Sequence, residues 1–145
     1  PLCALLALAT AFSRILTMLN APQVLASFLS GIISSRISFL ILLNIVLLIL
    51  GMFIDGAPAI LILSPLLMPI AQQFGIDPVH LGIIMVCNLA VGLASPPFGL
   101  NLFVARYTNG APIIEISRKV VPFILAFLVA LILITFVPSI SLCLV

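Results

Sequence analysis

Long runs of apolar residues alternate along the chain with short clusters of glycine, proline and charged residues. A helix needs about 20 apolar residues to cross a bilayer, and this criterion identifies residues 1–19 as one predicted span. The final span lies within residues 112–138, where residues 120–138 are apolar without interruption. Residues 22–36 are only moderately apolar, so the region 1–36 is predicted to hold a span followed by a short connecting helix.

Residues 37–73 are too long for a single crossing. One helix of 37 residues would extend about 55 Å, against a hydrocarbon core of about 30 Å. The sequence GMFIDGAP interrupts the run at Gly51–Pro58. Glycine permits non-helical backbone, and proline begins a helix more readily than it continues one. The interruption leaves two arms of about 14 to 16 residues each, which predicts a re-entrant helical hairpin.

A second interrupted element follows the hairpin. Gly75, Asp77 and Pro78 predict that one helix ends and another begins at once, with Asp77 as the N-cap. The next apolar run, 78–105, is long enough to cross once but contains the motif SPPFG. This motif predicts an unwound middle at Gly92–Gly99 and therefore a discontinuous helix.

The most polar run is 106–119, for which we expect a loop with a short turn of helix. It carries three basic residues, while the opposite side of the predicted topology carries Arg36. Because basic loops prefer the cytoplasmic side, the loop is predicted to be cytoplasmic and the hairpin entrance external.

Composition excludes a water-soluble protein. The chain has 145 residues, of which 65% are hydrophobic and 6% are charged, with a mean hydropathy of +1.54. About a quarter of the residues of a soluble domain are charged, and disorder requires low hydrophobicity. A net charge of +2 carries no nucleic-acid footprint, so we expect no nucleic-acid partner. The predicted class is an all-α integral membrane protein in the lipid bilayer, and the abrupt start at Pro1 indicates the C-terminal part of a longer chain.

Two breaks at membrane depth are the main functional signal. Non-helical backbone there leaves carbonyls and amides unpaired unless they line a cavity or meet a ligand. Unwound carbonyls can coordinate Na⁺, while helix N-termini attract anions. The alternative is that each break only kinks a packed helix, but two breaks in adjacent elements favour an ion site. The candidate Na⁺ ligands lie at these breaks and are Gly51, Gly56, Gly92, Ser95 and Gly99.

Asp55 is the only carboxylate well inside an apolar stretch, where an ionisable group costs a few kcal/mol. It is a candidate substrate-binding residue, and it could also bind a cation, carry a proton or cap the open amides of the hairpin. Asn88 and Asn101 flank the second break and either bind substrate or hold free backbone groups. Asn44 is expected to hold neighbouring helices together through hydrogen bonds. His80 is expected to lie at the interface between membrane and water. No catalytic motif is present in the sequence, so neither an enzyme nor a cofactor is expected.

Three motifs, GMFIDG, GIDPVH and GLASPPFGLNLFVA, lie within residues 51–105. With these motifs the chain resembles the large membrane subunit (DctM type) of TRAP transporters, the tripartite ATP-independent periplasmic family. The resemblance extends over essentially all 145 residues. Within that subunit, the chain is similar to the second inverted repeat. Members often carry Thr-Pro-Pro where Ser95, Pro96 and Pro97 stand here, and the hydroxyl is kept.

The resemblance implies an elevator-type secondary transporter in the bacterial inner membrane. Uptake of small organic anions (dicarboxylates, sialic acid or 2-oxo acids) would be driven by Na⁺ as the coupling ion. The implied partners are a small membrane subunit (DctQ type) and a periplasmic substrate-binding protein (DctP type).

On the family pattern, 37–73 is the hairpin and 78–105 the discontinuous helix, and together they form a Na⁺ site and one wall of the substrate site. The competing hypothesis is a non-transporting or channel-like scaffold subunit, which would have the breaks without any dependence on Na⁺.

Overall fold

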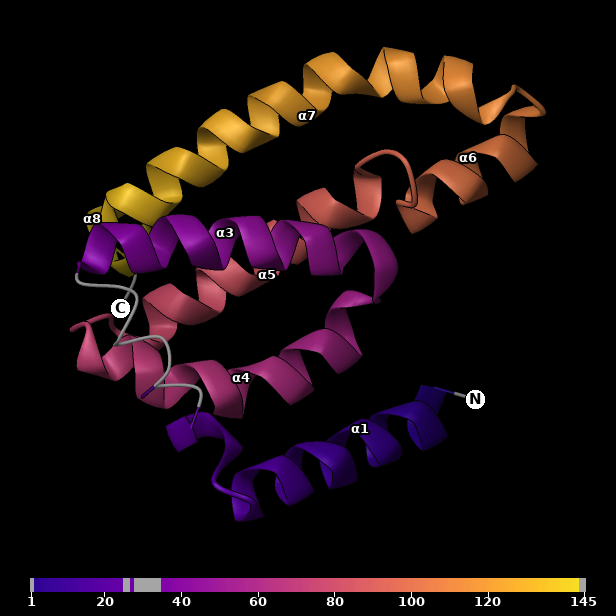
Figure 1. Cartoon of the computed structure of the whole chain (residues 1–145). Coiled ribbons are helices and arrows are strands. Elements are labelled where there is room, and N and C mark those ends of the chain that lie inside the picture. Colours follow the sequence, from indigo (N-terminus) through magenta and orange to yellow (C-terminus); the bar gives the residue numbers. More distant parts are fainter. Residues whose placement is uncertain (1, 25–26, 28–34, 144–145) are drawn as a thin grey trace.

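The computed structural model describes residues 2–24, 27 and 35–143. Apart from a helical turn at 21–24, the connecting helix predicted within 22–36 lies largely outside the described residues. The described part of the chain contains helices and no strands, which confirms the all-α prediction. The helices are α1 (Leu2–Met18), α3 (Arg36–Phe53), α4 (Gly56–Gln73), α5 (Pro78–Ala94), α6 (Leu100–Asn109), α7 (Ile113–Phe136) and α8 (Pro138–Leu142) (Figure 1).

The helices stack in layers around α5. Helix α1 packs on α4, α4 packs on α5, and α5 also contacts α3, α6, α7 and α8 (Figure 1). Helices α3 and α5 run in the same direction, α4 runs opposite to both, and α5 lies between α3 and α4. The buried apolar core joins α3, the end of α4 and the first half of α5, and Phe39 of α3 stacks on Phe74 with ring centroids 5.0 Å apart.

Three of the described helices, α3, α4 and α7, are long and apolar enough to cross a membrane. Helices α3 and α4 have 18 residues each, so the predicted arm length of 14 to 16 residues is wrong. The reason is that the α3–α4 turn is shorter than the expected tip: Gly51 remains inside α3 and Gly56 already belongs to α4. The turn lies at the level of the α5–α6 break and well short of the α6–α7 connection (Figure 1).

The sequence signals between α4 and α5 are confirmed. Gly75 has a φ of +67°, and its N–H donates to the Gln72 carbonyl at 3.0 Å. The next N–H, that of Ile76, donates to the Ala71 carbonyl, which completes a Schellman C-cap. Asp77 then caps α5, because its Oδ1 accepts hydrogen bonds from the backbone N–H groups of the first turn.

Two predicted boundaries are wrong. Helix α5 continues to Ala94, so Gly92 is helical and the unwound segment is Ser95–Gly99. The Pro96–Pro97 pair causes the break, since it supplies no N–H groups and disfavours helical backbone at Ser95, whose ψ is 134°. Residues 106–119 are mainly helical, and the α6–α7 connection is only 110–112. A hydropathy profile reports whether side chains prefer lipid or water, and it does not report backbone conformation. Polar helix ends therefore resemble loops in a hydropathy profile.

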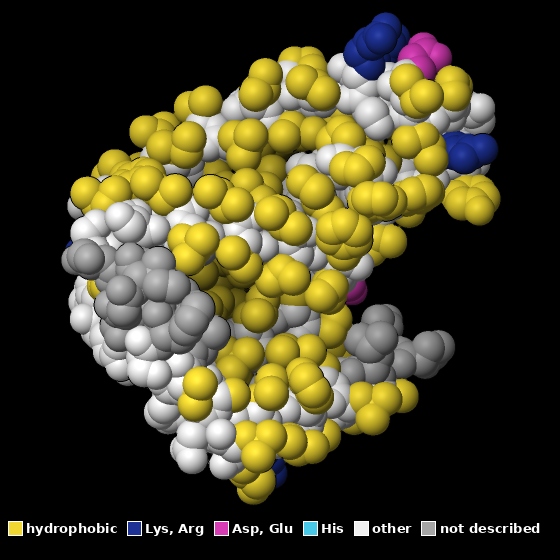
Figure 2. Space-filling view, viewed as in Figure 1, with side chains coloured by type: hydrophobic (Ala, Val, Ile, Leu, Met, Phe, Trp, Pro, Cys, Tyr) yellow, Lys and Arg dark blue, Asp and Glu magenta, His cyan; other side chains and the backbone are white. Residues whose placement is uncertain are grey.

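Charged side chains are few and gather near the α6–α7 connection on the face shown in Figure 2, whereas apolar side chains cover most of the remaining surface. Exposed large apolar side chains occur on every long helix that the structure describes. This distribution fits surroundings of lipid or of other transmembrane helices.

Candidate functional site

The α3–α4 turn consists of Ile54 and Asp55. Asp55 is the N-cap of α4, and its Oδ1 accepts a hydrogen bond from the Gly56 N–H at 2.8 Å. Its side chain is otherwise exposed on the chain surface. The structure therefore places the carboxylate at the tip of the helix pair, where it already performs the capping role and keeps further lone pairs available.

The α5–α6 break is a tight five-residue segment. The N–H of Ser95 donates to the Gly92 carbonyl, and the N–H of Gly99 donates to the Ser95 carbonyl, both at 2.9 Å. The buried Ser95 hydroxyl donates to the Val91 carbonyl at 2.7 Å. A Cβ atom at Gly99 would lie 2.5 Å from the Leu93 carbonyl oxygen, so only glycine fits there.

The turn and the break meet through two glycines and two aromatic rings. A Cβ atom at Gly92 would lie 2.7 Å from both the Cα and the carbonyl carbon of Gly51. At the tips, the rings of Phe53 and Phe98 pack with centroids 5.0 Å apart. The structure thus brings together the Na⁺ candidates of the two breaks, and Gly51 and Gly92 have a clear packing role inside their helices.

Backbone carbonyls are the polar groups most available at these breaks. Within the described residues, the carbonyls of 51–54 at the turn and of 96–98 in the break accept no hydrogen bond. Carbonyl and hydroxyl oxygens suit hard cations such as Na⁺. In the same part of the chain, no group of three His, Cys, Asp or Glu side chains could hold a metal ion. The available ligand atoms at the two breaks, carbonyl and hydroxyl oxygens, therefore suit an alkali cation better than a transition metal.

Asn88 and Asn101 lie in contrasting surroundings. Asn88 is fully buried, and its Nδ2 donates to the Asn44 Oδ1 at 2.8 Å and to the Ile84 carbonyl at 2.9 Å. Asn101 is exposed on α6, just beyond the break. The structure joins Asn88 to α3, as was expected for Asn44, and leaves Asn101 accessible.

Two residues near this region have roles that the sequence does not reveal. Thr135 of α7 is 1% exposed, and its hydroxyl is 3.3 Å from the Asn44 Oδ1. His80 is also buried, and its Nε2 donates to the Thr135 carbonyl at 3.2 Å. Thr135 stands in an apolar run with no flanking signal. Only the position of α7 against α3 and α5 identifies it.

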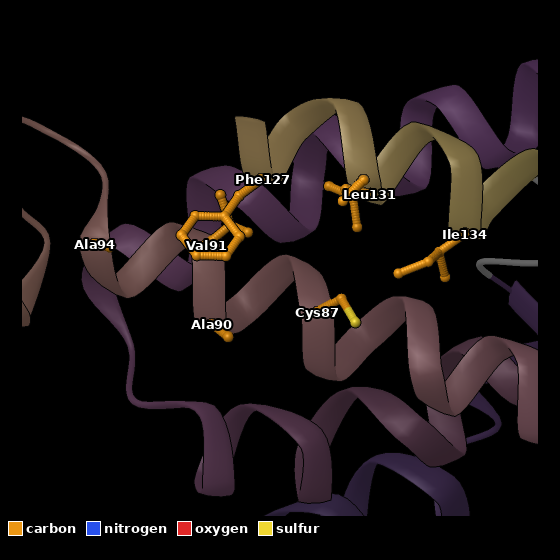
Figure 3. Close-up of a pocket in the computed structure, with 8 residues that line it drawn as sticks. Cys87, Ala90, Val91, Ala94, Phe127, Leu131 and Ile134 are labelled. Atoms are coloured by element: carbon orange, nitrogen blue, oxygen red, sulfur yellow. The ribbon is translucent and has the colours of Figure 1, made fainter. Parts of the chain in front are cut away.

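A cavity of about 250 Å³ opens between α5 and α7, on the side of α5 away from α4 (Figure 3). Its lining is apolar and rich in small side chains: Cys87, Ala90, Val91, Ala94, Phe127, Ala130, Leu131 and Ile134. The lining side chains offer no oxygen or nitrogen atom to an ion or an organic anion, so the cavity is not part of the candidate site.

Comparison with known families decides the class of the protein. The family described as "Tripartite ATP-independent periplasmic transporter, DctM component" matches residues 1–140. The chain belongs to this family. As a member of the DctM family, it is a multi-pass protein of the bacterial inner membrane, in agreement with its three apolar helices of spanning length.

Similar relatives carry the names of different substrates. The C4-dicarboxylate TRAP transporter large permease protein DctM of Pseudomonas aeruginosa is 45% identical over 140 residues, which cover 97% of this chain and 33% of the relative. The isethionate TRAP transporter permease protein DctMQ of Oleidesulfovibrio alaskensis is 43% identical over 94% of this chain and 21% of its own length. The sialic acid TRAP transporter large permease protein SiaM of Vibrio cholerae is 35% identical, with corresponding shares of 92% and 31%. The chain thus spans between a fifth and a third of these DctM-family relatives.

Proposed function

We propose that this chain forms the part of a TRAP transporter large permease that binds Na⁺ and presents one wall of the site for a small organic anion. Uptake would be secondary active transport, driven by Na⁺ and free of any catalytic step. The names of the relatives support the substrate class, since dicarboxylates, sialic acid and isethionate are all small organic anions.

The observation that carries the proposal is the contact between two helix breaks. The α3–α4 turn and the α5–α6 break lie together, and both contain carbonyls without partners among the described residues. In a bilayer such carbonyls need a ligand or a water-filled cavity. Na⁺ satisfies this need, with carbonyl oxygens near Gly51, Gly56, Gly92 and Gly99 and the Ser95 hydroxyl as candidate ligands.

The remaining polar groups of the site divide between the ion and the anion. The Asp55 carboxylate would repel an anionic substrate, and we therefore propose that it supports the cation. Asn101 is exposed and can donate hydrogen bonds from its amide to a carboxylate or sulfonate. We also propose that the helix pair α3–α4 enters and leaves the membrane from one face, so that its turn would lie inside the bilayer.

The proposed partners are a small membrane subunit and a periplasmic substrate-binding protein. The family is tripartite by its description, and the DctMQ name of one relative supports a DctQ-type partner. A DctP-type binding protein would deliver the anion to the external side of the permease.

The test is uptake of radiolabelled anion into proteoliposomes that contain the full-length permease and both partners. Candidate anions are first ranked by thermal stabilisation of the cognate binding protein. Uptake should require both an inward Na⁺ gradient and the binding protein, and a Na⁺ ionophore should abolish it. Uptake that persists without Na⁺ would instead indicate a channel-like subunit.

A further inference from the structure

We propose that Asn44, Asn88 and Thr135 form a polar network that holds α3 on α5, so that the α3–α4 turn and the α5–α6 break move as one unit. This inference rests on the proposed transport function and assigns Asn44 and Asn88 as positioning residues for the ion site. It replaces direct substrate binding as the role of Asn88.

The geometry of the network is set within each helix. All three side chains donate to the carbonyl four residues earlier in their own helix: Asn44 to Leu40 at 2.7 Å, Asn88 to Ile84 at 2.9 Å and Thr135 to Leu131 at 2.7 Å. These bonds fix the rotamers. The Asn44 Oδ1 then accepts from the Asn88 Nδ2 at 2.8 Å and lies 3.3 Å from the Thr135 hydroxyl, whose single proton is shared between this oxygen and the Leu131 carbonyl. Three helices therefore meet at one oxygen.

Burial makes these bonds effective. Asn88 is 0% exposed and Thr135 is 1% exposed, while Asn44 is partly buried, so water has little access to their hydrogen bonds. Polar side chains that meet between helices are a means of association in membranes, where lipid removes the hydrophobic drive. The network therefore links α3, α5 and α7 at a defined register.

The same register of α3 against α5 is required for the contact between Gly51 and Gly92. Asn88 lies four residues before Gly92, and Asn44 lies seven residues before Gly51, which are about one and two helical turns. Because the two glycine backbones touch, a slide of α3 along α5 would open this contact and break the asparagine bond together. The network thus preorganises the carbonyls that face the proposed ion.

Helix α4 is held in a different way. Among the described residues, no side-chain hydrogen bond joins α4 to another helix, and the buried residues of α4 lie near its two ends. Helix α3 also contacts α5 more extensively than it contacts α4, its neighbour in the pair. Helix α3 is therefore held on α5 by polar and apolar contacts, whereas α4 is held by apolar packing against α1 and α5.

The chemistry of the Asn88 amide supports positioning over substrate binding. Both N–H groups of its Nδ2 are engaged, one with Asn44 and one with Ile84. Its Oδ1 is buried without a partner among the described residues, and an oxygen acceptor does not bind an anionic carboxylate. Asn88 has no donor left for an organic anion.

The experiment replaces the network with a covalent link. The double variant N44C/N88C is made in a cysteine-free full-length permease, in which Cys3, Cys87, Cys143 and every cysteine outside this chain become alanine. It is reconstituted with both partners. In its reduced form, the Na⁺ concentration for half-maximal uptake should rise several-fold. Hg²⁺, which bridges two thiolates, should return it close to the value of the cysteine-free parent, and a dithiol should reverse this rescue. The Hg²⁺-treated parent is the control.

Two outcomes would overturn the proposal. Unchanged Na⁺ dependence in the reduced variant would show that the network is dispensable. A bridged variant that stays impaired would show that the amide groups themselves contact the ion or the substrate, since mercury cannot replace an amide oxygen.

A milder pair of variants covers failure of the double variant to fold. Thr135→Val removes the hydroxyl with little change of shape and should lower the thermal unfolding midpoint in detergent. Thr10→Val on α1 removes an equivalent bond to the carbonyl four residues earlier, also 2.7 Å long, but no contact between helices. Equal midpoints for the two variants would contradict the network. This comparison needs no transport, so it remains decisive if the parent lacks Na⁺-driven uptake and the proposed function itself fails.

Discussion

The two breaks of this DctM-family chain interrupt the helical backbone with different side-chain chemistry. At the α3–α4 turn the chain reverses, and a carboxylate, Asp55, caps the new helix. At the α5–α6 break the chain continues onward, and a neutral hydroxyl, Ser95, bonds back to the helix that ends. The turn takes two residues, whereas the break takes five, from Ser95 to Gly99.

The difference shows that a reversal of the chain direction and a break within a continuing helix require different residues. The reversal needs a capping side chain at a helix start, and the aspartate provides it with a charge. The continuation needs the helix to stop and resume, which the proline pair and Gly99 impose through sterics alone. A charged break beside a neutral one gives the proposed ion site one formal negative charge, and the variants below test each side separately.

The largest effect is expected where the two breaks touch. In Gly92→Ala the new methyl group would overlap the Gly51 backbone and lie 2.9 Å from the Leu48 carbonyl oxygen. Backbone atoms cannot rotate away, so we expect a loss of about 3 kcal/mol of stability and little folded protein in the membrane. Fluorescence-detected size-exclusion chromatography after heating measures this. Gly82→Ala in the same helix meets no atom within 4 Å and should unfold at or above the wild-type temperature.

The next effect concerns the charged break. Asp55→Asn keeps an oxygen that can cap Gly56 but removes the charge, so expression and insertion should be unchanged. Loss of a charge-assisted contact of about 1.5–3 kcal/mol should lower the uptake rate at limiting Na⁺ roughly 10- to 150-fold. Asp77→Asn is the matched control, because Asp77 caps α5 in the same way outside the proposed site. Wild-type uptake by Asp55→Asn would leave Asp55 as a cap only.

The neutral break should respond more weakly. Ser95→Ala removes one oxygen while the carbonyls remain, and a lost polar contact of about 1–3 kcal/mol corresponds to roughly 5- to 150-fold lower Na⁺ affinity. Ser95→Thr keeps the oxygen and should stay close to wild type. Initial uptake rates against Na⁺ concentration distinguish the variants, and identical curves for all three proteins would show that Ser95 only packs the break.

The smallest effect is expected at the aromatic contact between the tips. Phe53 and Phe98 are both more than half exposed, so their rings contribute mainly through each other. A double-mutant cycle with Phe53→Leu and Phe98→Leu should give a coupling of about 0.5–1.5 kcal/mol in unfolding free energy. Additive effects would mean that the tips are not held together by this contact.

Local signals in the sequence predicted the elements of the fold well. Gly75, Asp77 and Pro78 each act within a few residues, and the structure confirms the helix end and start that they predict. The turn near Asp55 and the break around Pro96 follow from the same short-range rules. The proposed ion-binding roles of the glycines and Ser95 stay predictions, although the structure brings them together.

Long-range contacts explain what the sequence did not predict. From the sequence alone, Gly92 is predicted to break its helix, whereas in the structure it allows the close contact with Gly51. That contact depends on the register of α3 against α5. The pairing of Asn88 with Asn44 and the part played by Thr135 depend on the same packing. The polar ends of α6 and α7 resemble a loop in the sequence, because hydropathy reports the preference of side chains for lipid or water and not backbone conformation.

The difference in length between α3 and α7 has a consequence for how the membrane potential would act on the proposed ion. Helix α3 has 18 residues and α7 has 24, so the α3–α4 turn lies about 27 Å along a path for which α7 measures about 36 Å. In the proposed Na⁺-driven transport, with the voltage falling along the length of α7, a cation that enters from the side of the α3 N-terminus and reaches this turn would have passed about three quarters of the membrane voltage. At 100 mV this corresponds to about 1.7 kcal/mol for each elementary charge. Most of the work that the membrane potential performs on the ion would therefore be done before the site closes, and only the remaining quarter during its release.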